Sequence, residues 1–150
     1  MRCFAVNYAD CVFRIETGYE CSGYFCLSYG NSDTLIEMTV EPNSAQIIAI
    51  ECIYLGEVLH EPWLKLPDHR SNPNLRSYYE AVCYDDFSRS TYPCVVNLIN
   101  DELSLIFSST CEPMFYYVHD RVEYYYNKDF DLVYIKVVDL TAGELAYLNR

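Results

Sequence analysis

Basic residues are scarce in this sequence. Ten Lys and Arg stand against 22 Asp and Glu, which gives a formal net charge of −12. Such a field repels the phosphates of nucleic acids and of anionic lipids, whereas it attracts basic surfaces and speeds their encounter. We therefore expect no direct binding to nucleic acid or membrane, and a positively charged partner.

Long apolar runs and export signals are missing as well. No stretch reaches the roughly 18 apolar residues of a membrane-spanning helix, and the apolar run within residues 1–10 is interrupted too early for a signal peptide. Both observations predict a cytoplasmic protein. Eight cysteines occur without a CxxC or CxH pair. In that compartment we expect them to be thiols packed as small apolar side chains, not disulfides or zinc ligands.

The motifs of the common enzyme classes are also absent. The sequence contains no GxSxG, HExxH, P-loop or GxGxxG. Its three histidines, His60, His69 and His119, each stand beside an acid. Adjacent residues of a strand point to opposite faces, so His119 and Asp120 are not expected to work as a pair. We predict that the protein is not an enzyme and that it has no cofactor and no metal site.

Alternation of apolar and polar residues with period two is the dominant pattern, and it predicts about nine strands. The first two strands are expected to form a hairpin that turns at Thr17 and Gly18. The last strand of the first half is apolar on both faces apart from Glu51, which is typical of a central strand covered on both sides. The strands expected in this half are 11–16, 19–29, 35–41 and 47–55.

The second half repeats the alternation around turn signals. Asn100 and Asp101 separate two expected strands, and residues 127–129 separate two more. The strands expected in this half are 94–99, 103–107, 115–126 and 132–140.

Two short helices are expected. Pro73 begins a segment with apolar residues at helical spacing, which predicts a helix over about 73–84. Thr141 and Glu144 fit a capping box, which predicts a second helix over 142–149.

These elements predict a mainly β (α+β) protein in which residues 1–150 form a single domain. An antiparallel sheet with both helices on one face fits the pattern, and a half-barrel or a sandwich fits strands of this number as well. No internal repeat and no linker is visible in the sequence.

Acidic residues concentrate in two regions. No Lys or Arg occurs between Arg14 and Lys65, a span that holds eight acids. The second region lies around the last hairpin, beside a run of three of the 16 tyrosines. Exposed tyrosines are favoured at protein interfaces, although a solvated acidic rim and core tyrosines would give the same pattern. The residues expected to contact a partner are Glu37, Glu41 and Glu51 in the first region and Glu123, Tyr124, Tyr126 and Asp129 in the second.

The chain as a whole resembles the immunity proteins of bacterial toxin–immunity systems, including those of contact-dependent growth inhibition. The resemblance is carried by the acidic span 16–61, the tyrosines of 124–126 and the closing segment 137–145. It implies a cytoplasmic protein that binds and neutralises a toxin domain, often a nuclease. Two other classes fit the composition, namely an acidic nucleic-acid mimic that inhibits by carboxylate display and a small-ligand or sugar-binding β-module that uses exposed tyrosines.

Overall fold

The computed structural model describes residues 2–20, 23, 25–31, 33–61, 69–70, 91–108 and 112–150. The expected helix at 73–84 lies outside the described residues. The mainly β prediction is confirmed. The strands form two sheets, and one short helix follows the last strand.

The first sheet has the order β1-β2-β5-β4-β3-β7 and the second has the order β6-β10-β11-β12-β9-β8. Each contains five antiparallel strands and a two-residue strand paired in parallel at one edge. The first sheet comprises β1 (Phe4–Tyr8), β2 (Cys11–Glu16), β3 (Phe25–Gly30), β4 (Leu35–Val40), β5 (Ile47–Tyr54) and β7 (Thr91–Tyr92). The second comprises β6 (His69–Arg70), β8 (Val95–Ile99), β9 (Glu102–Ile106), β10 (Phe115–His119), β11 (Val122–Tyr126) and β12 (Leu132–Val137).

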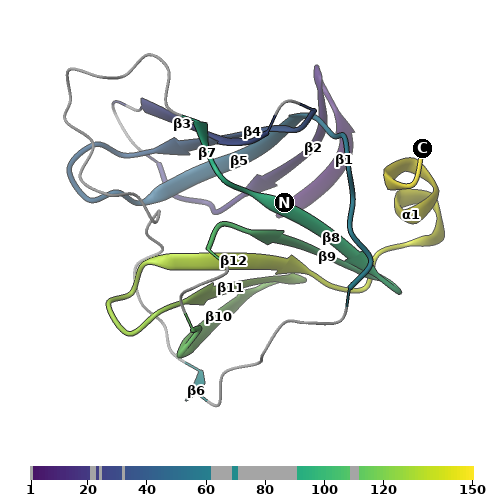
Figure 1. The fold of residues 1–150 in the computed structure, drawn as a ribbon. Coiled ribbons are helices and arrows are strands. Elements are labelled where there is room, and N and C mark those ends of the chain that lie inside the picture. The colour runs from purple at the N-terminus through teal and green to yellow at the C-terminus, as the bar shows by residue number, and fades with distance from the viewer. Residues whose placement is uncertain are drawn as a thin grey trace.

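The two sheets lie face to face as the layers of a sandwich, with the helix α1 (Ala142–Leu148) at one end, beside β1 (Figure 1). One core cluster draws on the inward side chains of both sheets, including Phe13 and Ile50 from the first and Leu105 from the second. Tyr29 and Phe107 meet edge to face across the layers, with ring centroids 4.9 Å apart. Of the arrangements that the sequence left open, the described residues form the sandwich.

Both sheets have the same topology. In each, a hairpin is followed by a three-strand meander, and the last strand of the meander inserts beside the second strand of the hairpin. One register irregularity also corresponds, since the ladder shifts after Thr39 in β4 and after Tyr125 in β11, whereas the shift between Leu35 and Ile36 occurs in the first sheet alone. The sequence shows no internal repeat, yet the fold contains one, with β1 to β5 matching β8 to β12 in order.

The hairpin expected at Thr17 and Gly18 is wrong. The strand β2 pairs with β1 and β5, whereas β3 pairs with β4 and β7. Instead of turning there, the chain is fixed to β5 by the Thr17 hydroxyl, which donates to the Ile47 carbonyl. The actual first hairpin joins β1 to β2, with positive φ at Asn7 near the end of β1 and at Ala9 in the turn, and no glycine marks that turn.

The single strand expected over 115–126 is also wrong, because a turn at Asp120 and Arg121 divides it into β10 and β11. Asp120 takes the positive φ of 56° that this turn needs. The hairpin at Asn100 and the β11–β12 hairpin are confirmed. The capping box is confirmed too, since the Thr141 side chain accepts from the Glu144 N–H and the Glu144 carboxylate accepts from the Thr141 N–H.

Candidate functional site

The outer face of the first sheet carries the candidate site. A row of side chains crosses four strands there, because Arg14 pairs in register with Glu51, Glu51 with Glu37, and Glu37 with Ser28. Glu16 lies two residues from Arg14 on the same side of β2. All five side chains are half-buried, so they are accessible but held on the sheet. We call Arg14, Glu16, Glu37, Glu51 and Ser28 the acidic face.

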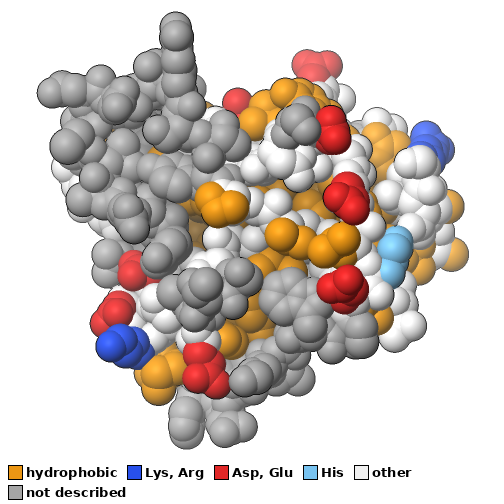
Figure 2. Space-filling view, in the orientation of Figure 1, with side chains coloured by type: hydrophobic (Ala, Val, Ile, Leu, Met, Phe, Trp, Pro, Cys, Tyr) orange, Lys and Arg blue, Asp and Glu red, His pale blue; other side chains and the backbone are white. Residues whose placement is uncertain are grey.

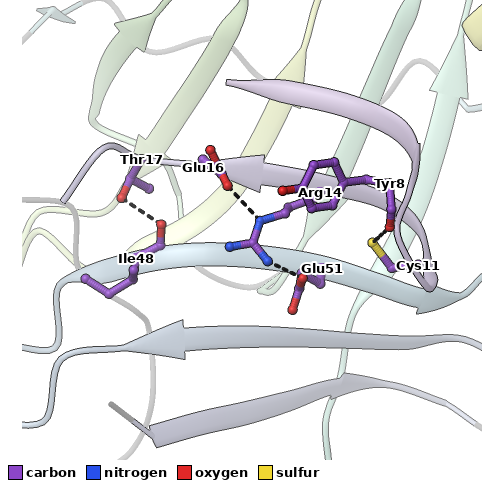
Figure 3. A network of polar contacts seen from close by, with 7 residues as sticks. All are labelled: Tyr8, Cys11, Arg14, Glu16, Thr17, Ile48 and Glu51. Atoms are coloured by element: carbon purple, nitrogen blue, oxygen red, sulfur yellow. Dashed lines mark hydrogen bonds and ion pairs between the residues drawn. The ribbon is translucent and has the colours of Figure 1, made fainter. Parts of the chain in front are cut away.

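Arg14 is fixed by a network of its neighbours (Figure 3). Its Nε donates to Glu16 Oε1 at 2.9 Å, its Nη1 pairs with Glu51 Oε1, and its guanidinium lies 5.4 Å from the centroid of the Tyr8 ring. Partial burial lowers the pKa of Arg14, but hydrogen bonds and charges from Glu51 and Glu16 outweigh it and raise the pKa. Arg14 therefore stays cationic, and it neutralises one of the three carboxylates on this face.

Glu37 and Glu51 stand directly opposite each other on neighbouring strands. Side chains in such a position have their Cβ atoms about 4.5–5.5 Å apart, and like charges there destabilise a sheet. Glu51 is compensated by Arg14, whereas no hydrogen bond or ion pair joins Glu37 to another side chain in the described part of the chain. Glu37 therefore presents its charge to solvent from the middle of the sheet.

Glu41, predicted with these two, lies just beyond β4 and organises the turn into β5. Its carboxylate accepts from the N–H of Asn43 and from the N–H and hydroxyl of Ser44, both of the latter at 2.7 Å. The bonds from Ser44, chiefly from its hydroxyl, lower the pKa of Glu41. The structure thus brings Glu37 and Glu51 together and leaves Glu41 at the rim of the acidic face.

The second predicted group does not form one surface. Tyr124 and Tyr126 are 0% and 2% exposed, so their side chains are not available at the surface. Tyr124 belongs to the core between the sheets, whereas Glu123, the preceding residue, points to the other face of β11. Asp129 is exposed in the turn after β11, where its N–H donates to the Asn127 side chain.

The outer face of the second sheet is aromatic, with Tyr125 and Tyr134 buried and Tyr116 half-buried. Tyr116, Tyr125 and Tyr134 are register partners on β10, β11 and β12 and their rings stack, those of Tyr125 and Tyr134 at 4.2 Å between centroids. The Tyr125 hydroxyl donates to Glu123, and Lys136 Nζ lies 3.3 Å from Glu102 Oε2. We call the three stacked tyrosines the tyrosine ladder.

Exposed tyrosines occur elsewhere than predicted. Tyr8 at the end of β1 and Tyr54 at the end of β5 are 43% and 51% exposed. Sequence reasoning missed Tyr8 and Arg14 as site residues. Period two could have placed Arg14 beside Glu16, but not beside Glu51, which is 37 residues away along the chain.

A cleft of about 540 Å³ opens between the edge of the first sheet and the start of α1. Arg121 is one of the residues that line it. Its guanidinium lies 5.2 Å from the centroid of the Phe4 ring, and both Nη atoms bond the Glu144 carboxylate. The bond from Arg121 is the main cause that lowers the pKa of Glu144 to about 2. The cleft is lined by Arg2, Phe4, Ala5, Val6, Asp120, Arg121, Thr141, Gly143 and Glu144.

Within the described ranges, no group of three or more His, Cys, Asp and Glu could hold a metal ion, and no helix is long and apolar enough to cross a membrane. The cysteines described there, Cys3, Cys11, Cys26, Cys52 and Cys94, are free thiols. No protein-family model matches the sequence, and no curated protein matches it either.

Proposed function

We propose that this protein is a cytoplasmic immunity protein that binds a basic toxin domain, of nuclease type, and neutralises it without catalysis of its own. The acidic face is the binding surface. Residues 2–61, which include the first sheet apart from β7, carry nine acids against two arginines and hence a charge of −7. A nuclease needs a positive groove for its phosphates, so an inhibitor of the opposite charge suits it.

The observation that carries this proposal is the like-charge pair of Glu37 and Glu51. A sheet gains nothing from two carboxylates in register, because they repel each other. A cationic side chain from a partner would relieve that repulsion when it binds between them. Arg14 offsets the repulsion at Glu51 only, so within the described residues Glu37 keeps an uncompensated charge, which would favour a complex with a basic surface.

The charges and the rings would serve different steps of binding. Carboxylates are spread over the surface in Figure 2 with few Lys or Arg among them, which suits long-range attraction of a basic partner. Such charges mainly raise the association rate, up to roughly 10⁸–10⁹ per molar per second at low salt. Slow dissociation needs buried anchors, for which Tyr and Arg are favoured. Tyr8 with Arg14 stacked on it is the candidate anchor.

The test measures association and dissociation rates, and it first requires a binding partner. The neighbouring reading frames should be searched for a basic polypeptide, and the binding of that polypeptide to this protein should be followed by surface plasmon resonance. A salt increase from about 50 to 500 mM shortens the Debye length severalfold and should slow association while changing dissociation little. Glu37→Lys should slow association more than Glu57→Lys, a control with the same net charge at an exposed residue outside the sheet.

Three results would contradict the proposal. An association rate indifferent to salt would leave the −12 charge as a matter of solubility alone. Equal effects of Glu37→Lys and Glu57→Lys would remove the acidic face as the binding surface. A partner that is a neutral sugar or another small ligand would favour the small-ligand module instead.

A further inference from the structure

Three of the four sheet edges have a further segment along them. The edge at β10 pairs with β6 and the edge at β3 pairs with β7. The edge at β8 pairs with residue Leu59. Within the part of the chain that the structure describes, β1 alone has no such cover. Proteins commonly block their edge strands, since unpaired backbone groups recruit other chains.

The cover on β8 shows how an extended segment binds there. The Leu59 N–H donates to the Val96 carbonyl at 2.9 Å, and the Leu98 N–H donates to the Leu59 carbonyl at 2.8 Å. The segment runs parallel to β8. The Asn97 side chain then bonds both the N–H and the carbonyl of Glu61, each at 2.9 Å.

The internal repeat identifies the matching groups on β1. Phe13 pairs with Cys52, the residue after Glu51, and Leu103 pairs with Val137, the residue after Lys136. Phe13 and Leu103 are therefore equivalent. Their partners in the hairpins are Val6 and Leu98. The equivalents of Val96 and Leu98 are thus Phe4 and Val6.

The backbone N–H and C=O groups of Phe4 and Val6 point away from β2, toward the open edge of the sheet. The Glu16 N–H donates to the Cys3 carbonyl, and in an antiparallel pair the residues that exchange hydrogen bonds alternate with those that do not. Cys3 and Ala5 therefore face β2. The Phe4 carbonyl and the Val6 N–H face outward, and no hydrogen bond joins either of them to another described residue.

The cleft lies at this same place. Phe4, Ala5 and Val6 form one wall, and the β10–β11 turn and the start of α1 form the other. After β5 the chain reaches the edge of β8 at Leu59, whereas after β12 it continues into α1, which lies beside β1 without pairing to it (Figure 1). The volume of about 540 Å³ is within the range of ligand-binding pockets.

We propose that an extended segment of the partner polypeptide binds in this cleft as an added strand, parallel to β1. A main-chain N–H of the segment donates to the Phe4 carbonyl, and a main-chain carbonyl accepts from the Val6 N–H, as Leu59 does on β8. Strand addition to a free edge is a common mode of peptide recognition. The partner's basic character rests on the proposed function, but the strand addition itself does not.

A second copy of this chain fits the cleft less well. Two copies would bring together two molecules that each carry a net charge of −12, and each would bring the α1 that lies beside its own β1 (Figure 1). A single extended segment avoids both problems. Sedimentation of the free protein as a dimer that Val6→Pro dissociates would instead identify a second copy as the occupant and overturn the proposal.

The first test compares two amides in the unchanged protein. Hydrogen exchange followed by NMR should find the Leu98 amide protected and the Val6 amide fast. A short synthetic peptide of alternating valine and lysine, used as the probe, should slow exchange at Val6 and leave Leu98 unchanged. A Val6 amide as slow as Leu98 before any addition, or no protection with the probe, would overturn the proposal.

The second test removes the single N–H. Val6→Pro deletes the outward donor but no bond of the β1–β2 ladder, and Val6→Ala is the matched control that keeps the donor. The probe should bind Val6→Pro about tenfold more weakly than Val6→Ala, through the lost hydrogen bond and the bulk of the ring. Should Val6→Pro not fold, a probe methylated on its backbone nitrogens should lose binding to the unchanged protein by a similar factor.

The two proposals fail in different ways. Equal binding to Val6→Pro and Val6→Ala would overturn the added strand and leave the acidic face untouched. A peptide of alternating valine and glutamate that protects Val6 as well as the lysine peptide does would leave the added strand standing and remove the preference for a basic partner.

Discussion

The two halves of the molecule have the same strand order, but their outer faces differ in charge and in aromatic content. Glu37 opposes Glu51 in the first sheet, and at the equivalent place Glu123 opposes Lys136 in the second. Where the first sheet has small polar or apolar residues, the second has the tyrosine ladder. The inward positions are apolar in both halves because the core requires it. The outward positions are free to differ, and there the first sheet carries two opposed carboxylates whereas the second carries stacked rings beside an opposite-charge pair.

The largest expected effect on the free energy of unfolding comes from a substitution that places two opposed carboxylates on the second sheet, as Glu37 and Glu51 are on the first. Lys136 is 8% exposed, so Lys136→Glu buries a carboxylate beside Glu123 and Glu102 and should lower the free energy of unfolding by about 3–5 kcal/mol. Urea denaturation at neutral pH measures this. Lys136→Met, which keeps the stem without the charge, is the matched control and should cost far less. Equal losses for both would show that charge is not what separates the two faces.

A smaller effect concerns the ion pair that joins α1 to the second sheet. The Arg121 bond lowers the pKa of Glu144 to about 2, below its value in the unfolded chain. The resulting stability is present above about pH 5 and is lost as the pH falls toward 2. Glu144→Gln, which retains the capping bond, should cost about 1–2 kcal/mol at pH 7 after screening by solvent.

The pH dependence of this variant is the sharper measurement. The difference in stability between Glu144→Gln and the unchanged protein should shrink as denaturation is repeated at decreasing pH and vanish near pH 2. Glu57→Gln, at an exposed residue, should show no such trend. A difference that stays constant with pH would mean that the ionised carboxylate contributes nothing.

The smallest energetic effect is expected on the acidic face. Glu37→Lys would give the first sheet the opposite-charge pair of the second and should raise the free energy of unfolding by about 0.2–1 kcal/mol. Thermal denaturation of this variant beside Glu37→Gln would separate the gain of attraction from the loss of repulsion. A stability gain together with slower association would connect the pair to binding, whereas a stability loss would show that Glu37 supports the fold.

The cysteines allow a comparison without any substitution. Cys26 is exposed on the first sheet, whereas Cys52 and Cys94 are buried between the layers. Burial raises the pKa of Cys52 to about 12. Alkylation of the native protein should therefore label Cys26 first, and Cys52 and Cys94 only after unfolding, as mass spectrometry of peptides can measure. Labelling of all three at one rate would contradict the buried positions.

The features that could be predicted from the sequence are those decided by residues close together in the chain. Alternation over 35–40, the turn at Asn100 and the capping box at Thr141 are each decided by neighbouring residues, and each was predicted. The strand 47–55 was expected to be covered on both sides. As β5 it is central, but two of its outward residues, Glu51 and Ile53, are only half-buried.

The predictions that failed depend on contacts between residues that lie far apart in the sequence. Three tyrosines in succession give no alternation, so nothing local says that Tyr124 points inward. The pairing of Arg14 with Glu51 depends on which strands are neighbours, and this is set by the packing of the whole sheet. β1 was missed because its hairpin has positive φ at Asn7 and Ala9 without a glycine.

The shared topology also determines the order in which the protein can be assembled. In each half the strand that comes last along the chain, β5 or β12, occupies the middle of the finished sheet. A ribosome therefore releases the flanking hairpin strands before the strand that joins them, and their edges stay open until it arrives. Pairings between distant segments fold slowly, in milliseconds to seconds, and strands awaiting partners are prone to aggregate. Loss of β12 would remove the centre of the second sheet, and we infer that this half folds only after its last strand has been synthesised.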